Sequence, residues 1–176
     1  MSRAPVTPWR EFARTVLSHP AGWLASGLGT GFAPVAAGTF GTLAAVLPYL
    51  LLRELPWPAY LATLVLAFAV GVWASDIVIG RLKIEDPGVV VWDEFVGFWL
   101  TMFLAPPGWH WIVVGFVLFR IADILKPWPA AMIDDKLGGG LGAMLDDAVA
   151  GLYAFACVQV LAHGERAGVF AALLGR

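Results

Sequence analysis

Residues 95–119 read FVGFWLTMFLAPPGWHWIVVGFVLF and contain no Asp, Glu, Lys or Arg. This run is longer than the roughly 20 residues that cross the hydrocarbon of a bilayer as a helix. The Pro-Pro-Gly at positions 106–108 divides the run, because two successive residues there lack a backbone donor. The run therefore predicts the ends of two apolar helices, at about residues 89–105 and 109–125, joined by a tight turn.

Similar uncharged runs fill much of the remaining chain, at residues 15–52, 55–75 and 148–164. The 176 residues are 60% hydrophobic and 14% charged, against about 25% charged in a typical soluble domain. A soluble fold of this size would leave too much apolar surface in water. The composition therefore excludes disorder and predicts a polytopic membrane protein of the all-α class, with residues 1–176 as one domain. The formal net charge of −2 gives no basic surface for nucleic acid.

The expected architecture is a membrane helical bundle of about five embedded helices. An amphipathic segment near residues 9–17 and a glycine-rich run at 22–41 precede it as an interfacial or re-entrant segment. A polar, glycine-rich stretch at 134–142 is expected to lead into the last helix as a loop. The five helices are expected at about residues 39–52, 59–79, 89–105, 109–125 and 144–163.

The distribution of lysine and arginine predicts the orientation of the bundle. With a cytoplasmic N-terminus and five crossings, eight basic residues fall inside and three outside, as the positive-inside rule requires. The inner set is Arg3, Arg10, Arg14, Arg81, Lys83, Arg120, Lys126 and Lys136, and the outer set is Arg53, Arg166 and Arg176. The same topology brings six acids to the inner face: Asp76, Asp93, Glu94, Asp123, Asp146 and Asp147. Carboxylates at that level are costly unless they face a polar cavity, a metal or one another.

Two pairs of adjacent acids stand at the heads of expected helices, Asp93–Glu94 and Asp146–Asp147. Neighbouring residues point about 100° apart on a helix, so each pair can contact two partners. Gly97, one turn after Asp93, leaves room for another backbone. Stabilisation by the helix dipole is one explanation of the acids. The other is a site for Mg²⁺, which takes a few carboxylates and keeps waters for a phosphate substrate.

Candidate phosphate ligands lie near these acids in the expected topology. Arg120 and Asp123 share a helix face and form either an internal ion pair or, with Lys126, a cationic phosphate site. Small and hydroxyl residues around Thr39 and Thr42 either line a phosphate site or permit tight helix packing. The one cysteine has no arginine-bearing phosphate loop after it and the three histidines are scattered, so a covalent phosphoenzyme on either residue type is not expected.

Four segments of the chain resemble the signature segments of the phosphatidylglycerophosphatase A family. They are VWDEFVG at 91–97, FRIADILKPWP at 119–129, GGLGAMLDDAVAG at 139–151 and GTFGTL at 38–43. The resemblance covers about residues 27–153. Ala37 departs from it, because proline is expected before this Gly-Thr.

The resemblance implies a multi-pass, Mg²⁺-dependent phosphatase of the bacterial inner membrane with its active site on the cytoplasmic side. Its substrate would be phosphatidylglycerophosphate, which loses the terminal phosphate. On this interpretation Asp123 either orients Arg120 or acts as general base. The expected catalytic and metal-binding acids are Asp93, Glu94, Asp146 and Asp147, with Asp123 as a further catalytic residue and Arg120, Lys126, Thr39 and Thr42 as substrate-binding residues.

A cation- or proton-coupled transporter is the alternative class, because intramembrane acids and broken helices also describe ion pathways. A transporter site is expected near the middle of the membrane, between two matching halves of the chain. These acids cluster at one interface, and the sequence has no evident internal repeat. The distribution of acids therefore favours the phosphatase.

Overall fold

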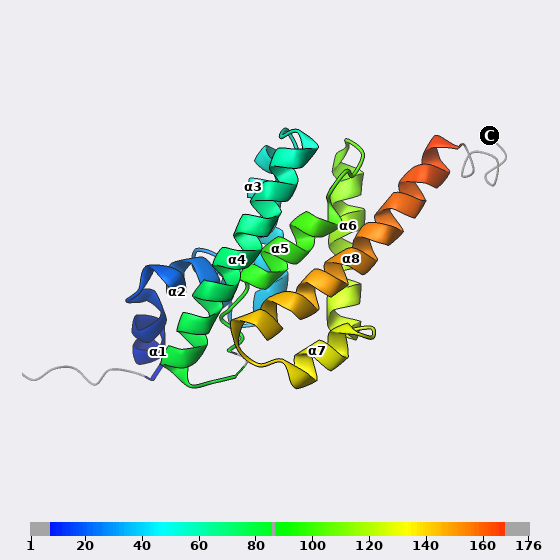
Figure 1. Cartoon of the computed structure of the whole chain (residues 1–176). Helices are drawn as coiled ribbons and strands as arrows, with labels where there is room; N and C mark the ends of the chain where they lie inside the picture. The colour runs from blue at the N-terminus through cyan, green and yellow to red at the C-terminus, as the bar shows by residue number, and fades with distance from the viewer. Residues whose placement is uncertain (1–7, 86, 168–176) are drawn as a thin grey trace, which may run out of the picture.

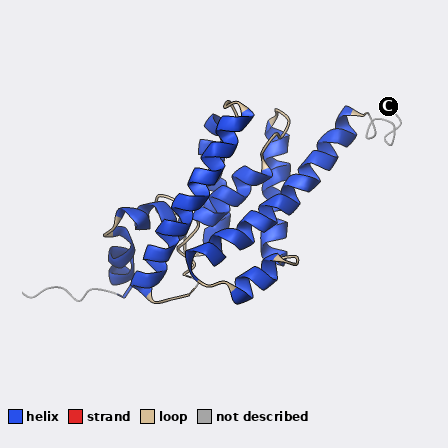
Figure 2. Ribbon diagram, viewed as in Figure 1, coloured by secondary structure: helices blue, strands red, loops and turns tan. Residues whose placement is uncertain are grey.

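The computed structural model describes residues 8–85 and 87–167, apart from the side chains at positions 134 and 135. Every regular element in this part of the chain is a helix, which confirms the all-α prediction (Figure 2). The elements are α1 (Pro8–Leu17), α2 (Pro20–Ala25), the 3₁₀ turn η1 (Thr30–Phe32), α3 (Ala37–Leu52), α4 (Trp57–Leu82), α5 (Trp92–Thr101), α6 (Trp109–Leu125), α7 (Ala130–Lys136) and α8 (Gly139–Arg166).

Two of the described helices are long and apolar enough to cross a membrane, α4 with 26 residues and α8 with 28. Helix α3 is apolar but has 16 residues, and α6 has 17. The 10 residues of α5 rise only about 15 Å. Helix length and composition therefore give two candidate spans in this part of the chain, and the expected number of about five embedded helices is not confirmed.

Helix α8 packs against four other helices, α4, α5, α6 and α7 (Figure 1). Its contact with α5 is close because glycines face each other: a Cβ on Gly151 would lie 2.5 Å from the carbonyl oxygen of Gly97. Small residues at such a crossing let two helix backbones touch. The expected role of Gly97 is therefore confirmed. Phe98, Phe119 and Met144 fill the core around the crossing and are fully buried.

The expected loop at residues 134–142 is wrong, because α7 occupies 130–136 and α8 already begins at Gly139. Glycine has low helix propensity, so a tertiary contact must stabilise this start. The carboxylate of Asp76 on α4 accepts a hydrogen bond from the Gly140 N–H, at 2.6 Å. A Cβ at position 140 would also collide with the Val72 carbonyl oxygen. Glycine at this position thus lets α8 reach α4, and Asp76 supplies the acceptor.

Helix α5 is shorter than expected at both ends. At its start, the Val91 N–H donates to the carbonyl of Ala25 in α2, so this residue is held outside the helix. At its end, turns at residues 102–105 replace the last helical turn before the two prolines. The Val91–Ala25 bond joins segments distant in sequence, so the apolar pattern alone could not predict where the helix starts.

The N-terminal segment is attached to one end of the bundle. Helix α1 matches the expected amphipathic segment, and α2 and η1 structure part of the glycine-rich run. Arg81, in the last turn of α4, donates to the Thr15 carbonyl at 3.1 Å and to the Ser18 hydroxyl at 2.7 Å. Near these contacts, Val16 and Ala25 pack against Val78 in a second, smaller hydrophobic core.

The ends of α4 and α6 and the starts of α5 and α8 lie at the same end of the molecule as α1 and α7 (Figure 1). This is the arrangement that the expected topology requires, and it gathers the six inner acids at one end. Arg3 and Arg176, which entered the count of basic residues, lie outside the described residues.

Candidate active site

A cavity of about 750 Å³ opens at this end of the bundle. It contains seven of the nine sequence-predicted site residues, which come from α5, α6, the turn after α6, and α8. They are Asp93, Glu94, Arg120, Asp123, Lys126, Asp146 and Asp147.

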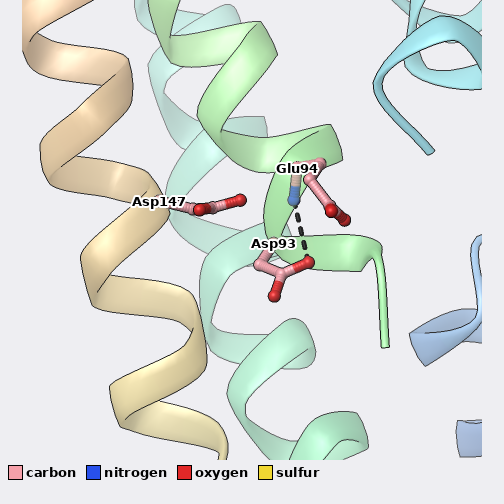
Figure 3. Close-up of side chains that lie close together, drawn as sticks. All are labelled: Asp93, Glu94 and Asp147. Atoms are coloured by element: carbon pink, nitrogen blue, oxygen red, sulfur yellow. Dashed lines mark hydrogen bonds between the residues drawn. The ribbon is translucent and has the colours of Figure 1, made fainter. Parts of the chain in front are cut away.

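Three carboxylates meet in this cavity and form what we call the acid cluster: Asp93, Glu94 and Asp147. One oxygen from each lies within 4.8 Å of the others. Figure 3 shows Asp147 reaching from α8 toward the first turn of α5, where Asp93 and Glu94 stand. Asp147 is only 4% exposed, and such a buried acid needs a compensating charge or a hydrogen-bond donor.

Backbone hydrogen bonds orient the acids within each helix. The Asp93 Oδ1 accepts the N–H of Glu94 at 2.9 Å, the dashed line in Figure 3. In the same way, Asp146 Oδ1 accepts the N–H of Asp147 at 3.0 Å. Each bond holds the first carboxylate of a pair against its own helix. The second acid of each pair, Glu94 or Asp147, belongs to the acid cluster.

Asp146, the fourth acid of the predicted metal set, is not part of the acid cluster. Its Oδ2 accepts a hydrogen bond from Lys126 Nζ at 2.8 Å, and its side chain is 7% exposed. Lys126 ends α6 in the left-handed conformation, with φ of +43°. Pro127 follows it and disfavours the α conformation for the preceding residue. Because α6 ends here, the ammonium group of Lys126 lies beside α8 and forms an ion pair with Asp146.

Arg120 is held on three sides. Its Nη1 lies 2.6 Å from Asp123 Oδ2 and 3.8 Å from Glu94 Oε1, and it donates to the Thr42 hydroxyl at 3.5 Å. The expected ion pair with Asp123 is therefore present, and Arg120 lines the cavity as well. Arg120 Nε and Glu94 Oε2 are buried and have no hydrogen-bond partner, so each is a buried polar atom with unsatisfied hydrogen-bonding capacity.

Thr39 and Thr42 are not among the residues that line the cavity. Thr42 is fully buried, donates to the Gly38 carbonyl at 2.9 Å and contacts Arg120. A Cβ at position 38 would collide with the Glu94 carboxylate. The small residues at the start of α3 therefore allow close packing against the site, and Thr42 supports the arginine.

Sequence reasoning assigned no role to several residues that the structure brings to the site. Lys136 and Glu85 line the cavity, and Asp76 fixes the start of α8. In the sequence, only the position of Lys136, two residues before the glycine run, indicated that it could lie near the site. Asp76 was recognised only as one of the inner acids.

The chemistry of the acid cluster fits a hard divalent cation. Its three side chains offer only carboxylate oxygens, which Mg²⁺ prefers and can combine with water and phosphate ligands. Glu94 Oε2 is buried without a hydrogen-bond partner, as expected where a carboxylate lacks a full counter-charge. The nearby Arg120 and Lys126 leave the cavity suited to an anionic group bound beside such a cation.

The outer surface of the bundle is strongly apolar, and side chains such as Leu47, Leu51, Val65 and Val160 are each at least 70% exposed. Exposed apolar surface of this extent is typical of contact with lipid. The fold and the cavity together define a membrane-associated helical protein with a cluster of carboxylates beside two cationic side chains.

Comparison with known proteins identifies the family. The model of the phosphatidylglycerophosphatase A family matches residues 23–162, and the chain belongs to this family. It is 37% identical over 158 residues to phosphatidylglycerophosphatase A of Escherichia coli, covering 89% of this chain and 92% of that protein. It is 39% identical over 149 residues to phosphatidylglycerophosphatase A of Haemophilus influenzae, covering 84% and 91%. No solved structure matches the chain.

Proposed function

We propose that this protein is a phosphatidylglycerophosphatase of the bacterial inner membrane. It hydrolyses the terminal phosphomonoester of phosphatidylglycerophosphate to phosphatidylglycerol and inorganic phosphate, with Mg²⁺ as cofactor. One observation carries the proposal: in a chain of this family, the acid cluster lies in the same cavity as the cationic side chains of Arg120 and Lys126.

In this proposal Asp93, Glu94 and Asp147 hold Mg²⁺. When bound, the ion neutralises phosphoryl oxygens and orients water. Arg120 binds the phosphoryl group through its planar guanidinium, which presents two parallel donors. Lys126, which is 31% exposed beside Asp146, adds a point charge at the same cavity.

Asp123 orients Arg120 in this mechanism, because its carboxylate lies 2.6 Å from the guanidinium. The new bond forms between a water oxygen and phosphorus, and the ester bond to the glycerol oxygen breaks. The glycerol oxygen takes up the proton that the attacking water loses. Negative charge on the phosphoryl oxygens is stabilised by groups already in place, so little reorganisation is needed at the moment of reaction.

The proposal is tested by phosphate release from phosphatidylglycerophosphate by the purified protein in detergent, with Mg²⁺ and with a chelator in its place. We expect release with Mg²⁺ and almost none with the chelator. Phosphatidylglycerol, which has a phosphodiester and no terminal monoester, serves as the control substrate and should release no phosphate. Absence of release above this control at saturating Mg²⁺ would contradict the proposed activity.

We further propose that α3, α5 and α6 are embedded in the membrane beside α4 and α8, with the cavity facing the cytoplasm. Two cysteines in a Cys157→Ser background test the orientation. Gly138→Cys introduces a thiol where a Cβ meets no neighbour, and Glu54→Cys introduces one at an exposed site in the turn between α3 and α4. In intact cells an impermeant thiol reagent should label position 54 and spare position 138. The reverse pattern would contradict a cytoplasmic cavity.

The transporter alternative has less support. Transporter sites lie near the middle of the membrane between two repeats, whereas the acids here lie at the end of the bundle where α4 and α6 finish and α5 and α8 begin (Figure 1).

A further inference from the structure

An apolar groove of about 410 Å³ lies beside the acidic cavity. Its own walls are Trp9 and Phe12 of α1, Phe32 of η1, and Val89. Every side chain that lines it is apolar, apart from glycines, which have none. The groove therefore offers a ligand no charged side chain and few polar partners, in contrast to the neighbouring cavity.

The walls of the groove are packed against one another. The ring of Trp9 stacks on Phe12 at 5.8 Å and meets Phe32 edge-on at 5.7 Å. Phe12 and Phe32 also meet edge-on, at 6.2 Å. Arg81 holds the far end of α1 to α4. These contacts form the groove before any ligand arrives, so little ordering cost is expected on binding.

The groove and the acidic cavity share part of their lining. Ala33, Pro34 and Gly88 line both. One continuous site thus has a charged compartment, with the acid cluster and Arg120, and a hydrocarbon-like compartment. A ligand that fits both compartments is an amphiphile with an anionic phosphate at one end and a hydrocarbon chain at the other.

We propose that this groove binds an acyl chain of the lipid substrate while its phosphate head lies in the acidic cavity. This inference rests on the proposed phosphatase function and extends it to the apolar part of the substrate. An acyl chain that enters the groove moves from one apolar environment, the bilayer, to another. The transfer therefore contributes little binding energy, and the groove acts mainly by positioning the phosphate head. Positioning of this kind raises the rate by holding the reacting group in place.

Gly88 provides the sharpest test, because it lies at the shared boundary and a Cβ there meets no atom within 4 Å. Gly88→Leu therefore starts a side chain in open space at the boundary between the two compartments. Gly80→Leu is the matched control, since position 80 on α4 is equally open and lines neither compartment. Two substrates are compared for each variant: dioctanoyl phosphatidylglycerophosphate and its deacylated head, glycerophosphoglycerophosphate.

Position 88 also lines the acidic cavity, so Gly88→Leu can slow both substrates. We expect kcat/KM to fall about tenfold further on the dioctanoyl substrate than on the deacylated substrate. Gly80→Leu should leave both values unchanged. Equal losses on both substrates, or no loss on either, would overturn the acyl-chain assignment. Failure of the wild-type protein to release phosphate from either substrate would instead overturn the proposed function.

A second variant changes the groove without touching the cavity. Phe12 lines the groove alone, so Phe12→Ala should lower kcat/KM severalfold on the dioctanoyl substrate only. Phe155→Ala is its control, because Phe155 is also half-buried and pairs with another phenylalanine, away from both compartments. If Phe12→Ala instead reduces membrane attachment and leaves the ratio between the two substrates unchanged, α1 is an anchor and the groove does not hold the substrate chain.

Discussion

The two acid pairs of this protein have the same local hydrogen bond but different tertiary partners. In both Asp93–Glu94 and Asp146–Asp147, the first carboxylate accepts the backbone N–H of the second acid, at 2.9 and 3.0 Å. Beyond this shared local geometry, both members of the α5 pair join the acid cluster. The α8 pair divides: Asp147 joins the cluster, and Asp146 binds Lys126.

The difference comes from what each helix meets. Gly97 and Gly151 let α8 approach α5, and this contact brings Asp147 to the first turn of α5. The turn at Pro127 sets Lys126 beside the same helix, where it pairs with Asp146. Two acid pairs with the same local hydrogen bond therefore acquire different chemistry through their neighbours, and substitutions in the two pairs should have different consequences.

The largest effect is expected for the acid cluster. Asp93→Asn and Asp147→Asn each remove a metal-binding charge and should lower kcat by about 10³-fold, which corresponds to about 4 kcal/mol. Phosphate release at saturating Mg²⁺ is the measurement, with thermal unfolding to verify folding. Glu54→Gln, at an exposed acid far from the cavity, is the control and should retain activity. Near-normal turnover of both cluster variants would refute the metal assignment.

Asp146→Asn should have a smaller effect, because this acid acts through Lys126. Loss of such a supporting partner typically costs about 10- to 100-fold. A double-mutant cycle with Lys126→Gln should show strong non-additivity, since both single changes break the same ion pair. A loss as large as that of Asp147→Asn, additive with the lysine change, would mean that Asp146 is itself a metal ligand and that the two pairs are equivalent.

Arg120→Lys tests the cation that faces the α5 pair. A lysine cannot reproduce two parallel donors, so kcat/KM should fall about tenfold, or about 1.4 kcal/mol. The Mg²⁺ dependence should stay near that of the parent protein. Full activity, or recovery with added Mg²⁺, would make Arg120 a structural partner of Asp123.

The smallest effect on catalysis is expected at the start of α8. Asp76→Ala removes the acceptor for the Gly140 N–H and should lower the free energy of unfolding by about 1 kcal/mol, as for other helix-capping residues. Asp76→Asn keeps an oxygen acceptor and should cost less. Both are measured by thermal unfolding in detergent, alongside activity. A large activity loss in Asp76→Asn without loss of stability would assign Asp76 a direct role in the site.

The sequence by itself determined the helical class and the position of the charges along the chain. In a long uncharged run the backbone satisfies its hydrogen bonds within helices. Pro56 precedes the start of α4, and Pro127 directly follows the end of α6. Since the acids flank these runs, helices that alternate in direction predict that the acids gather at one end. Most of the site was therefore predictable as a set of residues, and the motifs at 91–97 and 139–151 indicated the family.

Only the tertiary structure decided how these residues are paired. Helix α8 starts inside a glycine run because Asp76 of α4 accepts its N–H. Thr42 contacts Arg120 and does not line the cavity because α3 packs against the site. Asp146 holds Lys126 because α6 ends beside α8. The apolar groove adjoins the cavity because the loop residues Ala33, Pro34 and Gly88 line both. Each outcome depends on a contact between residues far apart in sequence, which local spacing and hydropathy do not encode.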